Sequence, residues 1–438
     1  MGLPHSDARE VWRGELTRII ADLHVHSRFA MACSGAINTA SMEQAAREKG
    51  LGVIGTGDFL HPKWLEEMKS TLVQDGDSGL FVLNGSTGGT RFVISDEICT
   101  IDGVNGFAKR IHHCVLLPSF EAVEALADSL KGYGSLGSDG RPILSIGAAH
   151  LVEEVFKVDG RAFVFPAHIW TPYFGVLGAR SGFNSIKEAY GDQEKHIHAV
   201  ETGLSSDPAM NWRVSELDKY ALISNSDMHS LGNMGRESNV FDIEGELTYD
   251  RIINAITDRD ANKLKMTVEF YPEEGRYHYD GHRDCKFSVN PEVGNTTVCR
   301  VCGKPLVIGV LHRVNDLADR PLGFMPKGAV PYVHQVPLTE VIAYSMRTTK
   351  YSPKVRAAYS RLIERFHDEF SVLAEAKPDE IAEASSEEIA DCIDNVRHER
   401  ISIKPGYAGV YGELDLLGRS RSPAANPISQ KSLFEFSS

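Results

Sequence analysis

Short apolar runs rich in Val, Ile and Leu recur along residues 19–229, and each carries a histidine or a carboxylate. Between several of them, as at residues 41–50 and 119–134, apolar positions return at helical spacing. Strands that alternate with helices are typical of a parallel sheet or barrel, so we predict an α/β fold. The runs are IIADLHVH (19–26), LGVIGTGD (51–58), RFVISDEI (91–98), IHHCVLLPS (111–119), PILSIGAAH (142–150), AFVFPAH (162–168), IHAVETG (197–203) and YALISNSDMH (220–229).

The pattern changes near residue 270, where short turn-rich segments begin, and again near residue 335, beyond which the sequence has helical periodicity. The last residues are rich in Ser and Pro, which is typical of a mobile terminus. We therefore predict a catalytic barrel at 17–268, a zinc-binding module at 269–335, a helical domain at 336–417 and a flexible tail at 418–438.

Length and composition narrow the class of protein. A chain of 438 residues with 42% hydrophobic content builds two or three domains and is neither disordered nor fibrous. It has no run of about 18 apolar residues and no apolar stretch at its N-terminus, so we expect a soluble, cytoplasmic protein. The net charge of −14 disfavours nucleic acid as a partner, but residues 300–366 carry eleven basic against four acidic side chains. A basic surface there would contact DNA phosphates.

Histidines and carboxylates at the strand ends form the main candidate site. His24 and His26 are two residues apart, so on a strand both side chains point to one face, and Asp227 and His229 repeat this spacing. Loops at the C-terminal ends of barrel strands converge on one face, which brings such residues together. A set of His, Asp and Glu without thiolates suits Zn, Mn, Mg or Fe in a hydrolytic site, often with two metal ions. The intervening strand ends add Asp58, Glu97, His168 and either His112 or His113, since alternation lets only one of these two face the metal.

Three of the seven cysteines lie within eighteen residues, a distribution that does not suit a disulfide framework. His282 and Cys285 form an H-x2-C pair, and Cys299 and Cys302 form a C-x2-C pair followed by a tight Gly-Lys-Pro turn. This spacing predicts a closed structural zinc site, which a short turn-rich module needs in order to fold. His278 is the alternative fourth ligand.

Along the chain, the candidate ligands occur in the order H-x-H, an acidic residue after the second strand, Glu, His, His and D-x-H. This order resembles the ligand pattern of the PHP (polymerase and histidinol phosphatase) family. Within that family, the segments 55–64, 166–175, 201–208, 224–230 and 299–321 look like endonuclease Q. The resemblance implies a distorted seven-stranded (β/α) barrel with a di- or trinuclear metal site. Carried onto this chain, the ligands are His24, His26, Asp58, Glu97, His113, His168, Asp227 and His229. His24, His26, Asp227 and His229 would hold the catalytic cluster, with Glu97 as a bridging ligand.

The chain departs from the family pattern in ways that leave the number of metals open. Many PHP proteins have Thr-Asp-His after the second strand, whereas this chain has Thr56-Gly57-Asp58 and a histidine, His61, three residues later. His113 is chosen over His112 because it aligns with the family's H-x-x-L-L pattern. Eight runs exceed seven strands by one, so we take the run 142–150 as the surplus element and His150 as a structural histidine.

The resemblance implies a DNA repair endonuclease that hydrolyses the phosphodiester 5′ to uracil, hypoxanthine, xanthine or an abasic site. Its cofactors would be Mg²⁺ or Mn²⁺ at the catalytic cluster and Zn²⁺ at the structural site. Zn²⁺ is an alternative ion for the catalytic cluster. Trp170, Tyr173 and Arg313 are the candidates for DNA contact. The C-terminal QKSLFEFSS resembles a sliding-clamp-binding peptide. The alternatives are a PHP phosphatase or exonuclease acting on phosphomonoesters or DNA ends, and a zinc-stapled DNA-binding adaptor without catalytic metals.

Overall fold

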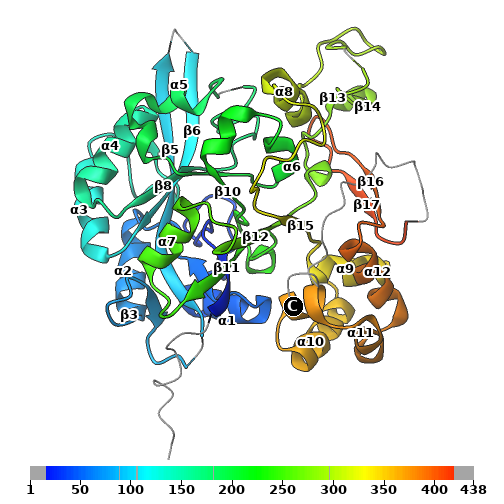
Figure 1. Ribbon diagram of the computed structural model, residues 1–438, viewed down its shortest axis with the longest axis horizontal. Helices are drawn as coiled ribbons and strands as arrows, with labels where there is room; N and C mark the ends of the chain where they lie inside the picture. The colour runs from blue at the N-terminus through cyan, green and yellow to red at the C-terminus, as the bar shows by residue number, and fades with distance from the viewer. Residues whose placement is uncertain (1–15, 88, 105–106, 181, 295, 419–438) are drawn as a thin grey trace, which may run out of the picture.

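The computed structural model describes residues 16–87, 89–104, 107–180, 182–294 and 296–418 (Figure 1). Most of the chain up to about residue 270 surrounds a mixed sheet. A small module with β13, β14 and α8 lies beside it, and a group of helices, α9 to α12, lies next to both (Figure 1). The prediction of an α/β fold with a C-terminal helical region is confirmed. In the described part of the chain, no helix has the length and apolar character needed to cross a membrane.

A ring of strand pairings forms the centre of the fold. β1, β2 and β5 pair in parallel, whereas β6 pairs antiparallel with both β5 and β8. An isolated bridge between Val164 and Ile197 links β8 to the parallel pair of β9 and β10, and a bridge between Val25 and Met228 leads back to the segment after β1. The strands of the ring are β1 (Leu16–Asp22), β2 (Val53–Gly55), β5 (Arg91–Val104), β6 (Phe107–Leu117), β8 (Phe163–Pro166), β9 (Ala199–Glu201) and β10 (Ala221–Ile223).

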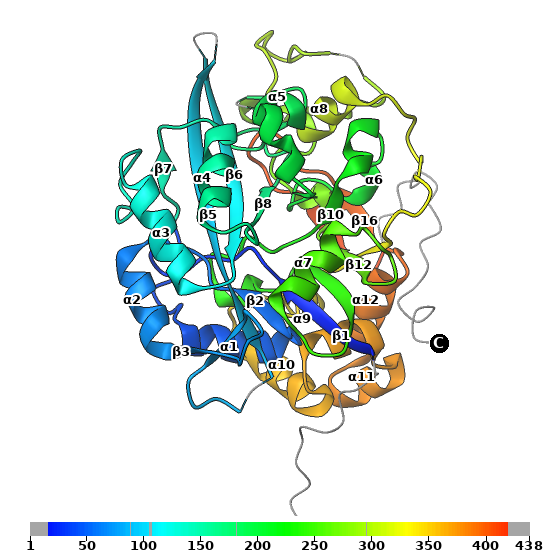
Figure 2. The same ribbon diagram turned by 60° about the vertical axis from the view of Figure 1, so that its left-hand side comes forward.

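The long hairpin of β5 and β6 departs from the predicted alternation of strands and helices. No helix separates these two strands, which project together beyond the ring (Figure 2). Antiparallel strands can follow one another directly, whereas parallel strands need a crossover connection. In the hairpin, Glu97 lies opposite Cys114 and Cys99 lies opposite His112. Residues that lie opposite each other share a face of the sheet, so the pairing places His112 on the same face as Glu97.

Further strands extend the main sheet on either side of the ring. β11 pairs antiparallel with β1, β12 pairs antiparallel with β11, and β15 pairs in parallel with β12. β15 falls within the segment predicted as the zinc-binding module, but it pairs with the main sheet. These strands are β3 (Leu72–Gln74), β4 (Phe81–Leu83), β7 (Ile143–Leu144), β11 (Ser238–Glu244), β12 (Leu264–Glu269) and β15 (Tyr332–His334).

The helices around the sheet begin and end where local sequence signals place them. The Asn38 side chain caps α1, which ends at Gly50 with a left-handed φ of 85°. The Ser119 side chain caps α3, whose apolar stripe faces the core. The run 142–150 supplies the short β7 and the start of α4, where His150 lies 3.3 Å from the Tyr133 hydroxyl, as expected for a structural histidine. The helices are α1 (Thr39–Lys49), α2 (Pro62–Thr71), α3 (Phe120–Leu130), α4 (Ala148–Val158), α5 (Ile186–Tyr190), α6 (Pro208–Asn211) and α7 (Tyr249–Thr257).

The C-terminal helices have a hydrophobic core of their own, built around residues such as Leu338, Val355 and Ile393. The hairpin of β16 and β17 returns to the small module, where Tyr407 bridges to Tyr279. The elements of the two parts are β13 (Asp280–His282), β14 (Phe287–Val289), α8 (Val310–Leu317), α9 (Leu338–Ser345), α10 (Pro353–Phe366), α11 (Pro378–Ala384), α12 (Glu387–Arg397), β16 (Ser402–Lys404) and β17 (Glu413–Asp415).

A buried ion pair joins the helical part to the barrel. The Lys49 ammonium, at the end of α1, lies 2.6 Å from a carboxylate oxygen of Glu369, and the two side chains are 8% and 5% exposed. The other oxygen of Glu369 accepts a hydrogen bond from the Leu338 amide at the start of α9. Lys49 therefore neutralises a carboxylate that also fixes the first turn of the helical part.

We predict that Lys49→Met destabilises the protein by roughly 3–5 kcal/mol, because it leaves the buried Glu369 carboxylate without its cationic partner. Urea denaturation followed by circular dichroism measures the change. Lys157→Met is the control, since Lys157 is exposed and its pairs with Glu153 and Glu154 lie at the surface. Equal effects of the two substitutions would show that the Lys49 pair contributes no more than a surface one.

Candidate metal centre

Four buried or half-buried side chains form a first ligand group at the strand ends. His24 and His26 flank Val25 just after β1, Glu97 lies within β5, and Asp227 follows β10. One ligand atom from each lies within 4.8 Å of the others. The His26 Nε2 atom is 3.2 Å from Glu97 and 3.1 Å from Asp227, and the His24 Nε2 atom is 3.7 Å from both carboxylates. These two Nε2 atoms and Asp227 Oδ1 are buried without hydrogen bonds, as expected of atoms that hold a metal ion.

A second group of ligand atoms shares Glu97 with the first. The Glu97 Oε1 atom is 2.6 Å from His112 Nδ1 and 2.9 Å from His168 Nε2, while its Oε2 atom faces His26. His112 and His168 also lie close together, with 3.2 Å between their facing nitrogens. A carboxylate that offers one oxygen to each of two groups is suited to bridging two metal ions. We call the first and second groups together the metal centre.

His113 does not lie at the metal centre, which corrects the choice made from the sequence. Its ring shares hydrogen bonds with the Tyr190 hydroxyl at 2.7 Å and the Thr100 hydroxyl at 2.8 Å. The register of β5 and β6 places His112 on the face of Glu97 and turns His113 to the opposite face. His112 therefore takes the position that the sequence analysis assigned to His113.

Two further predicted ligands lie beside the metal centre rather than in its ligand groups. The Asp58 carboxylate accepts a hydrogen bond from His26 Nδ1 at 2.8 Å and another from the Ser27 amide at 2.7 Å. This orients the His26 ring with its Nε2 atom toward Glu97. The His229 ring packs on His26 with 4.8 Å between ring centroids, and its Nδ1 atom lies 3.6 Å from Asp227.

Glu201, at the end of β9, is a buried residue of the site that the sequence analysis did not assign. Its carboxylate oxygens lie 3.1 Å from His24 Nδ1 and accept hydrogen bonds from the His168 amide at 2.7 Å and the Asn225 side chain at 2.8 Å. Carboxylates that bind the far nitrogen of a metal-ligating histidine fix its ring orientation and tautomer. The position of Glu201 near the end of the apolar run 197–203 is the sequence signal that could have identified it as a site residue.

The backbone at three residues of the site is left-handed. The φ angles are 53° at Asp58, 32° at His168 and 46° at Asp227, a region that residues other than glycine adopt at a cost. Gly203 packs against His168 so closely that a Cβ atom there would lie 2.8 Å from the His168 Cα. The chain thus turns sharply after three strands, which directs Asp227 and His168 to the two ligand groups and Asp58 to the far side of the His26 ring.

Burial, hydrogen bonds and neighbouring charges shift the pKa values of the side chains in the two ligand groups. Burial lowers the pKa of His112 to about 4, so this imidazole is neutral at pH 7. Burial disfavours the charged form of Glu97, but hydrogen bonds from His112 and His168 outweigh it and hold the pKa of Glu97 well below its ordinary value. Burial raises the pKa of the Cys114 thiol beside His24, so that the thiol stays protonated. Burial also disfavours the charged forms of His24, His26 and His168, but nearby acidic groups outweigh it and raise the pKa of each imidazole, so that a bound metal ion would replace a proton at these rings.

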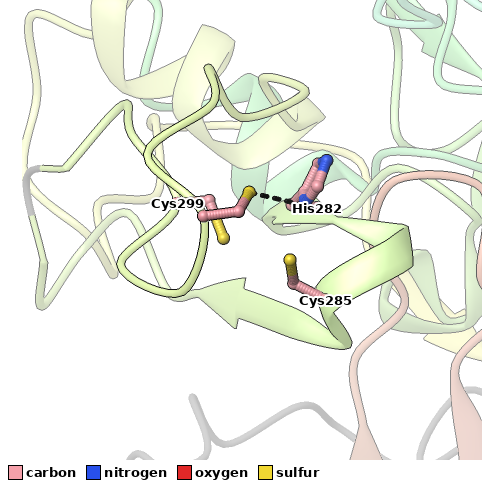
Figure 3. Close-up of side chains that lie close together, drawn as sticks. His282, Cys285 and Cys299 are labelled. Atoms are coloured by element: carbon pink, nitrogen blue, oxygen red, sulfur yellow. Dashed lines mark hydrogen bonds between the residues drawn. The ribbon is translucent and has the colours of Figure 1, made fainter.

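The four predicted zinc ligands of the small module also come together. Ligand atoms of His282, Cys285, Cys299 and Cys302 lie within 4.8 Å of one another, and we call this set the knuckle group. Figure 3 shows the labelled His282, Cys285 and Cys299 pointing toward a common point between the two short segments. His278 lies outside this group, and its buried ring packs against Tyr279. The knuckle group fits a closed four-ligand metal site.

Of the three residues predicted to bind substrate, Trp170 and Arg313 have other roles. The Trp170 side chain is fully buried and donates a hydrogen bond to Asn211. The Arg313 guanidinium, which extends from α8, donates hydrogen bonds to the carbonyls of Leu177 and Phe183 and so stabilises the loop that contains them. Tyr173 is 51% exposed. The sequence motifs did not distinguish these environments, because an aromatic or basic residue near a strand end suits both core and surface.

We predict that His282→Ala removes one equivalent of bound metal per chain, whereas His278→Ala leaves the metal content unchanged. The first substitution deletes a ligand from the knuckle group, and the second removes a ring outside it. Elemental analysis of the purified proteins measures the difference. Loss of metal from the His278 variant alone would reverse the assignment.

Comparisons with known proteins extend these observations. Residues 337–400 match a family described as the MJ0043 C-terminal domain. The uncharacterized protein YqxK of Bacillus subtilis (strain 168) is 27% identical over 416 residues, which cover 91% of this chain and 100% of YqxK. The uncharacterized protein MJ0043 of Methanocaldococcus jannaschii is 30% identical over 288 residues, which cover 62% of this chain and 35% of MJ0043.

Two solved structures are similar over almost the whole chain. The lesion-specific endonuclease PfuEndoQ from Pyrococcus furiosus has a TM-score of 0.81 and 29% identity, covering 91% of this chain and 95% of its own. Endonuclease Q in complex with a 27-mer duplex substrate, with an abasic lesion at the active site, has a TM-score of 0.80 and 29% identity, covering 94% of this chain and 100% of its own. Because agreement of this extent includes the barrel, the small module and the helical part, the protein is an endonuclease Q-like member of the PHP-domain proteins.

Proposed function

We propose that this metal-dependent hydrolase is a DNA repair endonuclease that cuts the phosphodiester 5′ to deaminated bases, namely uracil, hypoxanthine and xanthine, and to abasic sites. The observation that supports it most is the sharing of one buried carboxylate, Glu97, by two ligand groups at the strand ends. Two-metal sites of this kind are typical of nucleases and phosphatases. The similarity to endonuclease Q bound to a duplex with an abasic lesion favours DNA over small phosphate esters.

The residues of the metal centre fit divalent ions such as Mg²⁺ or Mn²⁺, which when bound polarise a phosphate and activate a water molecule for in-line attack. The protein contributes orientation and charge. Asp58 and Glu201 hold the rings of His26 and His24 so that both Nε2 atoms face the centre. Glu97 is fully buried, so its negative charge acts in a medium of low dielectric constant and attracts cations more strongly than it would at the surface.

Substrate contact is proposed for Tyr173, on the loop that follows His168. Its exposed ring is next in sequence to Phe174, which stacks on His112 with 4.4 Å between ring centroids. The loop therefore runs directly beside the metal centre. An enzyme that acts at a damaged base must take the nucleotide out of the stack, and an exposed aromatic ring can stack on a base.

The knuckle group is proposed to bind Zn²⁺, because three thiols and one imidazole are soft ligands with the spacing of structural zinc sites. We also propose that the C-terminal segment QKSLFEFSS binds a sliding clamp. That segment lies outside the described residues.

We predict that the protein nicks a duplex with one uracil, hypoxanthine or abasic site when Mg²⁺ or Mn²⁺ is present, and that Asp227→Asn lowers the rate at least about 100-fold. Even residues that only orient metal ligands typically contribute 10–100-fold, and Asp227 is itself a member of the first group. Denaturing gel electrophoresis of an end-labelled strand measures both the rate and the position of the cut.

Asp258→Asn is the matched control, since Asp258 pairs with Lys263 at the surface. Failure of the wild-type protein to nick any duplex of the panel would refute the proposal. Rapid turnover of a phosphomonoester, with internal lesions ignored, would instead identify a phosphatase of the same family.

A further inference from the structure

The metal centre is open to solvent on one side. The side chains of His24, His26 and Glu97 are at most 1% exposed. In contrast, Asp227 is 25% exposed and His229 is 30% exposed. Asp227 and His229 therefore form part of the solvent-accessible edge of the centre.

Arg141 lies near the same two residues, since its charge acts on both Asp227 and His229. Its side chain is 22% exposed, and the Nη1 atom is 3.1 Å from Glu97 Oε2, the oxygen that faces the first group. Among the hydrogen bonds of the described residues, the guanidinium bonds through Nη1, which leaves Nε and Nη2 for an oxygen acceptor. Arginine binds phosphate through such paired donors with defined geometry.

The local backbone holds Arg141 in this place. The Arg141 amide donates to the Asp139 carboxylate at 3.0 Å, and the Gly140 amide donates to the Phe29 carbonyl at 2.9 Å. A Cβ atom at Gly140 would collide with the Asp58 carboxylate and lie 2.7 Å from the Ala30 amide nitrogen. Only glycine allows this segment to pack so closely against the loop after His26, and this packing brings the next residue to Glu97.

The family resemblance left the number of metal ions open and included Asp58 and His229 among eight implied ligands. In the described residues, however, neither belongs to a group of three ligand atoms within 4.8 Å. The Asp58 carboxylate instead accepts hydrogen bonds from the His26 ring and the Ser27 amide. The positive charge on the open side comes from Arg141, which contacts Glu97 directly.

We infer that Arg141 is a catalytic residue that binds a non-bridging oxygen of the scissile phosphate. The centre then holds two metal ions, and the Arg141 guanidinium supplies the positive charge that a third ion would otherwise supply. This inference rests on the proposed function. The guanidinium would stabilise the charge that develops on the phosphate oxygens during attack, and it would do so from a fixed position beside the bridging carboxylate.

The test compares wild type with Arg141→Met, Arg141→Lys and a control, Lys131→Met. Lys131 is exposed and pairs with Asp128, so its substitution removes the same charge from the surface. Each protein is assayed for nicking of a duplex with an abasic site and for hydrolysis of bis(p-nitrophenyl) phosphate with Mn²⁺, and its metal content is measured by elemental analysis. The second substrate reports phosphodiester hydrolysis without a lesion.

We expect Arg141→Met to lower kcat about 100-fold on both substrates with little change in KM, and Arg141→Lys to recover part of that loss. Metal content should be the same in all four proteins, with two ions beyond the one at the knuckle group. Lys131→Met should behave as wild type.

Three outcomes overturn the inference: unchanged kcat in Arg141→Met, a third ion at the metal centre of the wild type, or loss of metal from Arg141→Met that accounts for its lost activity. If the wild type hydrolyses the small phosphodiester but does not nick DNA, the proposed function fails while the role of Arg141 is still decided by the small substrate. If the wild type hydrolyses neither, both fail.

Discussion

The centre of this protein depends on the compensation of one buried negative charge. Glu97 has no exposed surface, and a carboxylate in that environment is stable as an anion only if positive charge or hydrogen-bond donors surround it. Here His112 approaches it from β6, His168 from the turn after β8 and Arg141 from the loop before β7. The strands, the sharp turns after them and the packing of the loop at Gly140 all serve to bring these groups to the same carboxylate.

Much of this site could be predicted from the sequence, because the relevant patterns are local. Alternation within one run places His24 and His26 on the same face, and the end of a run marks the positions of Asp58, His168 and Asp227. In the same way, the spacing of the four ligands of the knuckle group depends on two short segments, and the structure brings these ligands together.

What could not be predicted depends on pairing between distant segments. The choice between His112 and His113 is set by the register of β5 against β6, and an expected alternation of strands and helices gave no information on that register. Burial of Trp170 and the bonds of Arg313 to main-chain carbonyls depend on how loops pack, which residue type alone does not indicate. Arg141 was missed because it follows no apolar run and reaches Glu97 from a loop.

The left-handed backbone at Asp58 and Asp227 has a consequence for related sequences. Asparagine tolerates this conformation about as well as aspartate does, whereas most other side chains add strain. An exchange of Asp for Asn at either position would keep the turn and the shape of the barrel while it removes a unit of negative charge. Metal affinity can therefore disappear from a descendant of this fold without any loss of shape, so overall similarity of structure identifies ancestry more securely than it identifies catalysis.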